Sequence, residues 1–342
     1  MSSDLRVTHS YNALDGYAAH MTDARAAELA SSPDVAMVVP DGECQGGSTQ
    51  ADAPWGISRI SRKDKLPKGS SASSLDYIFD YRPACSSINV YLLSTGINSR
   101  HVDFGSRARQ GAIFGKYHAE DVNGNGTFVA GIIGGKRFGI AKTASIISVK
   151  VIGDNGRGFV SNMIAGVNWA VNHAATTHQQ SILHLNFLTD TPNPLLEQAI
   201  NNAISKGIHV VVPAGDANRD AKGVSPARMP KVITVGAVNI ADDRWLESST
   251  KGSNFGAIVD VFAPGVAITT TWIRSATATQ SITGTRAAAA HVTGLVAYLL
   301  AAEGPRSPAD MRLRVKQLAI NGILSNIPIG TRNSMAWNGG GC

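Results

Sequence analysis

The chain alternates short runs of apolar residues with longer stretches in which apolar residues recur at helical spacing. The short runs predict strands at 90–93, 146–151, 182–187, 209–213, 232–235 and 259–262. The longer stretches at 161–174, 193–206 and 287–301 predict helices. Continuous apolar strands separated by helices predict an α/β fold, in which a central parallel sheet has helices on both faces and functional side chains at the carboxyl ends of its strands.

The N-terminal segment has a different pattern. Residues 5–7, 16–20 and 35–41 predict short strands, and residues 22–30 predict a helix with Thr22 as its N-cap. We therefore expect three parts: a small α+β unit at 1–44, a Gly- and Ser-containing linker at 45–52, and a main domain at 53–342.

Composition limits the partners of the chain. With 342 residues, 43% hydrophobic and 16% charged, it can bury one large core and a small additional unit. The net charge is +6, but the basic residues are scattered, for example Arg59, Arg62, Lys63, Lys65 and Lys68. Because such charges usually cover a solvated surface, and because long apolar runs are absent from the sequence, we expect neither nucleic acid nor membrane as a partner.

The cysteines bear on the compartment. The sequence contains three, Cys44, Cys85 and Cys342, and the last follows three glycines at the end of the chain. An odd number of cysteines and an N-terminus without a signal-peptide pattern favour an intracellular (cytoplasmic) location over a secreted one. The alternative is a secreted protein that folds without disulfides.

One loop carries the strongest motif. Residues 284–294 read Gly-Thr-Arg-Ala-Ala-Ala-Ala-His-Val-Thr-Gly. This resembles the Gly-Thr-Ser-Met-Ala-Thr-Pro-His-Val-Ala-Gly signature of subtilisin-like serine proteases. Arg286 stands where the family has its attacking serine, and His291 matches a structural histidine that we expect in the core.

Three further blocks follow the family order. Residues 89–96 resemble the strand that carries the family's aspartate, with Ser94 at that position. Residues 121–131 resemble the histidine block, with Asn125 in place of histidine, and residues 211–216 resemble the strand that ends in the oxyanion asparagine, with Asp216 there. The resemblance covers roughly residues 53–336, is nearest to the fungal proteinase K branch, and implies a subtilisin-like fold.

The chemistry of these substitutions sets the first functional expectation. Serine-protease catalysis needs a hydroxyl, a base, a carboxylate that orients the base, and donors for the oxyanion. Arg286 has no hydroxyl, Asn125 is not a base, and Ser94 lacks the charge that orients an imidazolium. The Asp216 carboxylate would repel a developing oxyanion where the family has a donor. These residues predict that the chain does not hydrolyse peptides.

The predicted cleft is changed on one side. Asn186, Phe187, Leu188 and Thr189 correspond to the family's Ser-Leu-Gly-Gly edge, so Leu188 and Thr189 place side chains where glycines admit the substrate backbone. The opposite rim, 154–159, resembles the family. The predicted ligand-binding residues are Gly156, Gly158, Phe159, Asn186, Phe187, Leu188 and Thr189, and we expect a small-molecule ligand or a compact peptide.

Two charged groups are expected to meet at the old oxyanion site. Asp216 and Arg286 correspond to positions that face one reacting carbonyl, so they could form a bidentate ion pair. Two roles are open for this pair. It either fills an inactive site and has only a structural role, or it is a polar group in the pocket that holds a carboxylate or enolate or moves a proton. His118 and Asp121 either reach the rim or belong to a surface loop.

The resemblance implies a metal site and an internal partner. Pro230, Val232 and Asp260 match positions that bind calcium in proteinase K-like enzymes, through two backbone carbonyls and one carboxylate. Calcium is the one candidate cofactor. Residues 1–44 resemble the second half of an inhibitor-type propeptide, a truncated remnant that we expect to stay attached as a partner of the body.

Two functional hypotheses follow. The first is a non-proteolytic subtilase homologue, or pseudoprotease, whose remodelled cleft binds a ligand or partner. The alternative is a repurposed isomerase or cyclase that acts on a small molecule in fungal secondary metabolism and uses the Asp216 and Arg286 pocket. Neighbouring biosynthetic genes would favour the second.

Overall fold

The computed structural model describes residues 5–12, 15–39, 41, 47–83, 87–177 and 179–340. The chain divides into two compact units, Met1–Cys44 and Gln45–Cys342. Cys44, Cys85 and Cys342 lie outside the described residues. The location inferred from the cysteines therefore stays a prediction.

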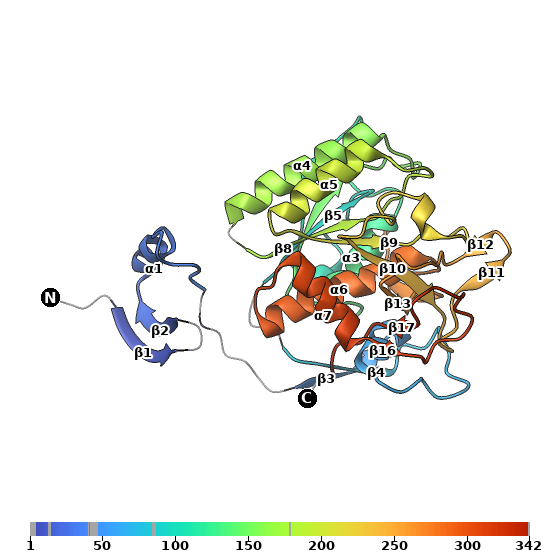
Figure 1. Ribbon diagram of the computed structural model, residues 1–342, viewed down its shortest axis with the longest axis horizontal. Helices are drawn as coiled ribbons and strands as arrows, with labels where there is room; N and C mark the ends of the chain where they lie inside the picture. Colours follow the sequence, from blue (N-terminus) through green and yellow to red (C-terminus); the bar gives the residue numbers. More distant parts are fainter. Residues whose placement is uncertain are drawn as a thin grey trace. The chain divides into compact units, whose positions relative to one another are not determined.

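The described residues of the first unit form a β-hairpin and one helix (Figure 1). Strands β1 (Leu5–Tyr11) and β2 (Gly16–Met21) pair antiparallel, and helix α1 (Asp23–Ala30) follows. The Thr22 hydroxyl accepts a hydrogen bond from the Arg25 N–H at 3.3 Å, which confirms the predicted N-cap. The predicted strand at 35–41 is wrong for its described residues, 35–39 and 41, because an apolar run becomes a strand only where another strand is available to pair with it.

The second unit is built on one nine-stranded sheet in the order β16-β17-β13-β10-β9-β8-β5-β7-β6. All neighbouring pairs from β17 to β6 are parallel, and β16 pairs antiparallel with β17. The strands are β5 (Asn89–Ser94), β6 (Ala108–Ile113), β7 (Ser145–Lys150), β8 (Ser181–Leu185), β9 (His209–Pro213), β10 (Ile233–Val238), β13 (Val261–Pro264), β16 (Ile320–Asn321) and β17 (Ser334–Met335).

Helices cover both faces of this sheet, as predicted (Figure 1). Helices α2 (Trp55–Ser61), α3 (Asn125–Gly134), α6 (Thr285–Glu303) and α7 (Pro308–Leu318) share one buried apolar cluster with alternate residues of the strands, such as Val90 and Leu92. Helices α4 (Val160–Thr177) and α5 (Pro194–Ser205) share a second cluster with the intervening residues, such as Tyr91 and Leu93. This alternation is the two-residue period of a sheet buried on both faces.

The remaining elements decorate this body. They are the pair β3 (Ser48–Ala53) and β4 (Tyr77–Tyr81), the pair β11 (Leu246–Ser248) and β12 (Lys251–Gly252), the hairpin β14 (Ile268–Thr271) and β15 (Thr279–Ile282), and the short helices η1 (Val102–Phe104) and η2 (Ala221–Gly223).

Helix α6 passes through the centre of the body. Its length and composition alone would allow it to cross a membrane, but 83% of its most apolar window is buried inside the protein. Small side chains at Ala287, Ala288, Ala289 and Ala290 let its first turns pack closely, and all four are buried. It is therefore the core helix of the fold, and its N-terminus is fixed at the edge of the sheet.

Candidate functional site

The four substituted positions gather at one edge of the sheet. Ser94 is the last residue of β5, and Asp216 follows β9 by three residues. Asn125 is the first residue of α3, and Arg286 is the second residue of α6. The carboxyl ends of the strands and the N-termini of two helices thus form this site, as the parallel topology requires.

Ser94 is held in the interior. It is 1% exposed, and its hydroxyl oxygen accepts a hydrogen bond from Asn186 Nδ2 at 2.8 Å. Asn186 Oδ1 is buried and has no hydrogen-bond partner. The bond between these two residues joins β5 to the end of β8, a contact that motif matching did not predict.

Asn125 is tied to its own turn. Its Nδ2 donates to Asn123 Oδ1 at 2.7 Å, and Asn123 Nδ2 donates to the backbone oxygen of Asp154 at 3.1 Å. Asp121 lies in this turn at 5% exposure. Its carboxylate accepts from the backbone N–H groups of Asn123, Gly124 and Thr127 and from the hydroxyls of Thr95 and Thr127. Asp121 therefore stabilises the start of α3 instead of facing the rim.

Gly126 lets α3 approach β5 closely, and we expect Gly126→Ala to destabilise the body strongly. A Cβ atom at Gly126 would lie 1.9 Å from the Gly96 backbone oxygen, so a backbone segment must move. Overpacking of this kind typically costs about 1–3 kcal/mol or more of the free energy of unfolding. Chemical denaturation measures the loss. Gly223→Ala is the matched control, since nothing lies within 4 Å of its added Cβ; equal stability loss in both variants would contradict this view of the α3 contact.

Asp216 caps α6. Its Oδ1 accepts from the Thr285 N–H at 2.8 Å and from the Thr285 hydroxyl at 2.6 Å, and Thr285 Oγ1 accepts from the Gly215 N–H at 3.1 Å. A carboxylate at a helix N-terminus is stabilised by the free N–H groups and the helix dipole. Thr285 is thus a central residue of the site that the motif comparison missed, although its hydroxyl was visible beside position 286.

The structure does not form the predicted ion pair between Asp216 and Arg286. Among the ion pairs of the described residues, none of 4.0 Å or less joins them, and Arg286 is exposed. Thr285 donates twice to Asp216 Oδ1, Asp216 is only half-buried and Arg286 is exposed, so water can solvate both charges without an ion pair. Arg286 instead places a positive charge on the surface of the site.

The two rims of the site differ in their side chains. A Cβ atom at Gly215 would lie 3.1 Å from Leu188 Cδ1, so the leucine lies directly over the Gly215 backbone. The Thr189 N–H donates to the Ser225 oxygen at 2.8 Å, which fixes this edge. On the opposite rim Phe159 is 74% exposed.

The other predicted ligand-binding residues divide between surface and core. Gly156 has a φ of +76° in a turn closed by a bond from its N–H to the Gly153 oxygen, and Gly158 follows it along this rim. Phe187 is 3% exposed and belongs to the core cluster of α4 and α5. Ligand binding by this group of residues stays a prediction.

Two histidines differ in their surroundings. The His118 side chain is 81% exposed, and its Nε2 lies 3.9 Å from Asp154 Oδ2. Lys150 Nζ donates to Asp154 Oδ1 at 2.6 Å from a completely buried position. His291 is 1% exposed and bonds to the Ala287 oxygen, and burial lowers its pKa to about 4. His291 is therefore a core residue, as expected, while His118 is a surface residue.

The candidate calcium residues lie just before β10 and just before β13. Asp260 is 2% exposed, and its carboxylate contacts Arg312 and Lys316 of α7. Among the described residues, no group of three or more His, Cys, Asp or Glu could hold a metal ion. Calcium remains a prediction that rests on Asp260 and the carbonyls of Pro230 and Val232.

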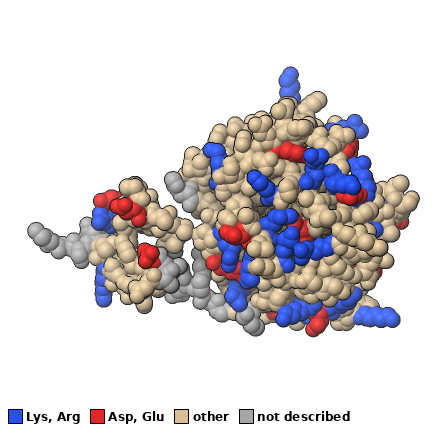
Figure 2. Space-filling model, viewed as in Figure 1, with Lys and Arg blue, Asp and Glu red and all other residues tan. Residues whose placement is uncertain are grey.

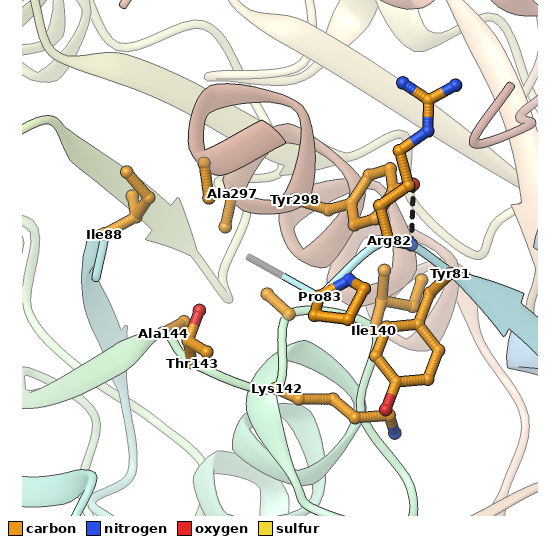
Figure 3. Close-up of a pocket in the computed structure, with 12 residues that line it drawn as sticks. Tyr81, Arg82, Pro83, Ile88, Ile140, Lys142, Thr143, Ala144, Ala297 and Tyr298 are labelled. Carbon is orange, nitrogen blue, oxygen red and sulfur yellow. Dashed lines mark hydrogen bonds between the residues drawn. The ribbon is translucent and has the colours of Figure 1, made fainter. Parts of the chain in front are cut away.

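Figure 3 shows a separate cavity in the same unit. It has a volume of about 150 Å³ and is lined by residues such as Ile88, Lys142, Ala297 and Tyr298. In Figure 3 the Tyr298 hydroxyl accepts a hydrogen bond from the Arg82 N–H, at 3.3 Å. Ala297 is eleven residues beyond Arg286 along α6, so about 16 Å of helix separates the cavity from the site. The cavity is at the amino ends of β5 and β7.

Comparisons with known proteins agree on the family. The subtilase family matches residues 86–333, and the peptidase inhibitor I9 family matches residues 2–45. The chain is 36% identical over 353 residues to the subtilisin-like serine protease Pen ch 18 of Penicillium rubens. The matched region covers 97% of this chain and 69% of that relative. It is 35% identical to subtilisin-like protease 3 of Saccharomyces cerevisiae, covering 95% of this chain and 70% of the relative.

The fold comparison agrees as well. The crystal structure of a cold adapted subtilisin-like serine proteinase matches with a TM-score of 0.74 and 32% identity, covering 84% of this chain and 98% of that one. The predicted subtilisin-like fold and the propeptide resemblance are thereby confirmed.

The predicted function does not agree with these findings. A non-proteolytic homologue, a pseudoprotease or a repurposed isomerase or cyclase is contradicted because the relatives are named as subtilisin-like serine proteases. That prediction weighed four substituted positions more heavily than the similarity along the remainder of the chain. The chain belongs to the subtilase family and carries an N-terminal segment of the inhibitor I9 type.

Proposed function

We propose that this chain is a subtilisin-like peptidase that acts on polypeptides. The observation that carries the proposal is 36% identity over 97% of the chain to a protein named as a subtilisin-like serine protease. The exposed rim at Phe159 and the helix N-termini at the carboxyl edge of the sheet also support it.

The proposal requires an attacking oxygen at a position other than 286, because arginine has no hydroxyl. Thr285 is adjacent, and its hydroxyl donates to the Asp216 carboxylate at 2.6 Å. A hydroxyl paired with a carboxylate can pass its proton to that carboxylate while the oxygen attacks a carbonyl carbon. We assign Thr285 as the nucleophile and Asp216 as its base.

The proposed reaction is an acyl transfer from the peptide to Thr285. Thr285 Oγ1 bonds to the peptide carbonyl carbon, its proton passes to Asp216, and the leaving amine takes that proton as the C–N bond breaks. Water then hydrolyses the ester and regenerates the hydroxyl. The N–H of Arg286, in the first turn of α6, and the nearby arginine charge suit a developing oxyanion.

The burial of Thr285 limits the expected rate of peptide cleavage. Thr285 is 1% exposed, so a substrate carbonyl reaches its oxygen only when the turn at Gly284 moves. Leu188 lies over Gly215, so its side chain narrows the space that we expect for the residue that supplies the carbonyl. We therefore expect slow cleavage after glycine or alanine.

The test is hydrolysis of a peptide library by the purified full chain, with products identified by mass spectrometry. Thr285→Val keeps the shape of the side chain and removes the hydroxyl, so it should abolish cleavage. Arg286→Ala leaves the hydroxyl in place and should retain cleavage. Its rate should fall at most by the contribution of one positive charge to oxyanion stabilisation. Thermal unfolding of each variant confirms that it is folded.

Contaminating proteases are the main risk at low turnover. Activity of this chain must follow the protein through two chromatographic steps and disappear in Thr285→Val. Cleavage that persists equally in Thr285→Val and Asp216→Asn would overturn the assignment of the nucleophile. Absence of cleavage by the folded wild type would overturn the proposed function itself.

A further inference from the structure

Asp260 links two elements of the body by its backbone and side chain. Its N–H donates to the Thr234 oxygen at 2.9 Å, and the Thr234 N–H donates back to Asp260 Oδ2 at 3.1 Å. Thr234 belongs to β10, while Asp260 directly precedes β13. The carboxylate is therefore fixed at the start of the β10 and β13 pair, at 2% exposure.

Two cations from α7 meet this carboxylate. Arg312 Nε lies 3.0 Å from Oδ2 and Nη2 lies 2.7 Å from Oδ1, which is a bidentate contact. Lys316 Nζ lies 3.2 Å from Oδ1. Residues four apart share one face of a helix, so both side chains reach the same point. We name Asp260, Arg312 and Lys316 the α7 clamp; Figure 2 shows Lys and Arg side chains gathered over the region of α6 and α7.

The oxygens of Asp260 are fully used. Oδ1 takes Arg312 Nη2 and Lys316 Nζ, and Oδ2 takes Arg312 Nε and the Thr234 N–H. A carboxylate oxygen offers about two acceptor positions, so no lone pair remains for a metal ion. Two positive side chains would also repel a divalent cation. The clamp as it stands does not fit the calcium ion that the family resemblance implies.

We propose that Arg312 and Lys316 take the place of a metal ion at Asp260, so that the stability of this chain does not depend on calcium. The Arg312 and Lys316 side chains are only 25% and 23% exposed, so the pairing is partly shielded from solvent. It fastens α7 to the β10 and β13 region, where the family resemblance implies a metal ion. Removing both cations should leave a carboxylate that can bind calcium together with the Pro230 and Val232 carbonyls.

The test is thermal unfolding of the full chain in EDTA, in calcium chloride and in magnesium chloride of the same ionic strength. Wild type should give the same Tm in all three. The double variant Arg312→Leu with Lys316→Met should have a lower Tm in EDTA, and calcium chloride should raise it.

A control on the same helix separates calcium binding from general loss of charge. Arg314 pairs with Glu303 through Nη2 to Oε1 at 2.7 Å, and this pair lowers the pKa of Glu303. Arg314→Leu should lower Tm without any response to calcium.

Two results would overturn the proposal. The first is a wild-type Tm that falls in EDTA and recovers with calcium but not with magnesium. The second is a folded double variant whose Tm does not change with calcium, because the charges of Arg312 and Lys316 would then not be what excludes the ion. If the double variant does not fold, calorimetric titration of wild type and of Lys316→Met with calcium chloride decides: binding to wild type contradicts the proposal, and binding to Lys316→Met alone supports it.

Discussion

Replacing Arg59 with methionine should lower the free energy of unfolding by about 3–5 kcal/mol, because it leaves a buried carboxylate without its partner. Arg59 Nε and Nη2 donate to Asp242 Oδ1 and Oδ2 at 2.9 and 3.0 Å, and neither side chain is exposed. Arg59 Nη1 also donates to the Arg62 oxygen. The pair joins α2 to the turn after β10, so its loss should destabilise the whole second unit. Urea denaturation measures the effect.

Two comparisons make that result specific. Arg100→Met breaks an exposed pair, Arg100 with Glu120, and should cost roughly 0–1 kcal/mol. The double variant Arg59→Met with Asp242→Leu removes both buried charges and should recover most of the loss, since the unpaired charge is what destabilises. A double variant less stable than Arg59→Met alone would show that the pair, not the stranded charge, carries the stability.

The chain should lose stability steeply below about pH 6 because three histidines are buried in the neutral form. Burial lowers the pKa of His184 to about 3 and of His209 and His291 to about 4, from the ordinary 6.5. Unfolded histidines therefore bind protons that the folded ones reject. The stability is fully present above pH 6.5 and is lost as pH falls toward the folded-state values. At pH 5 each of these histidines should have lowered the free energy of unfolding by about 2 kcal/mol relative to its value above pH 6.5.

His209 is the best single test of this acid effect. Both of its ring nitrogens are buried without hydrogen-bond partners, so His209→Phe should reduce the difference in Tm between pH 7 and pH 5. His118→Gln changes an exposed histidine and should leave that difference unaltered. An identical pH dependence of wild type and His209→Phe would contradict the assignment.

The fold could be predicted in detail where burial decides structure. Strands β5, β7, β8 and β9 begin and end within two residues of the predicted runs, because a strand buried on both faces is apolar throughout. The run at 35–41 failed in its described part because the pattern does not show whether a pairing strand exists. Local pattern therefore predicts a strand correctly only where the fold supplies a partner strand, as it does in the large sheet and in the β1 and β2 hairpin.

The sequence predicted where the residues of the site lie, but not which residues they contact. Motif order put Ser94, Asn125, Asp216 and Arg286 at one edge of the sheet, and the structure agrees. The partners depend on distances that a sequence does not contain: Asp216 binds Thr285, and Ser94 binds Asn186. The spacing of Arg312 and Lys316 was visible as a helical pair, but their target, Asp260, lies 52 residues from Arg312.

Hydrolysis in heavy-oxygen water tests the central claim, that this subtilase-family chain is a peptidase, most directly. Peptides cleaved by the chain gain the heavy oxygen in each new carboxyl group, and mass spectrometry counts these termini against a sample without protein. We expect labelled termini after small residues with wild type and Arg286→Ala, and none above background with Thr285→Val. Folded wild type that produces no labelled terminus after prolonged incubation contradicts it.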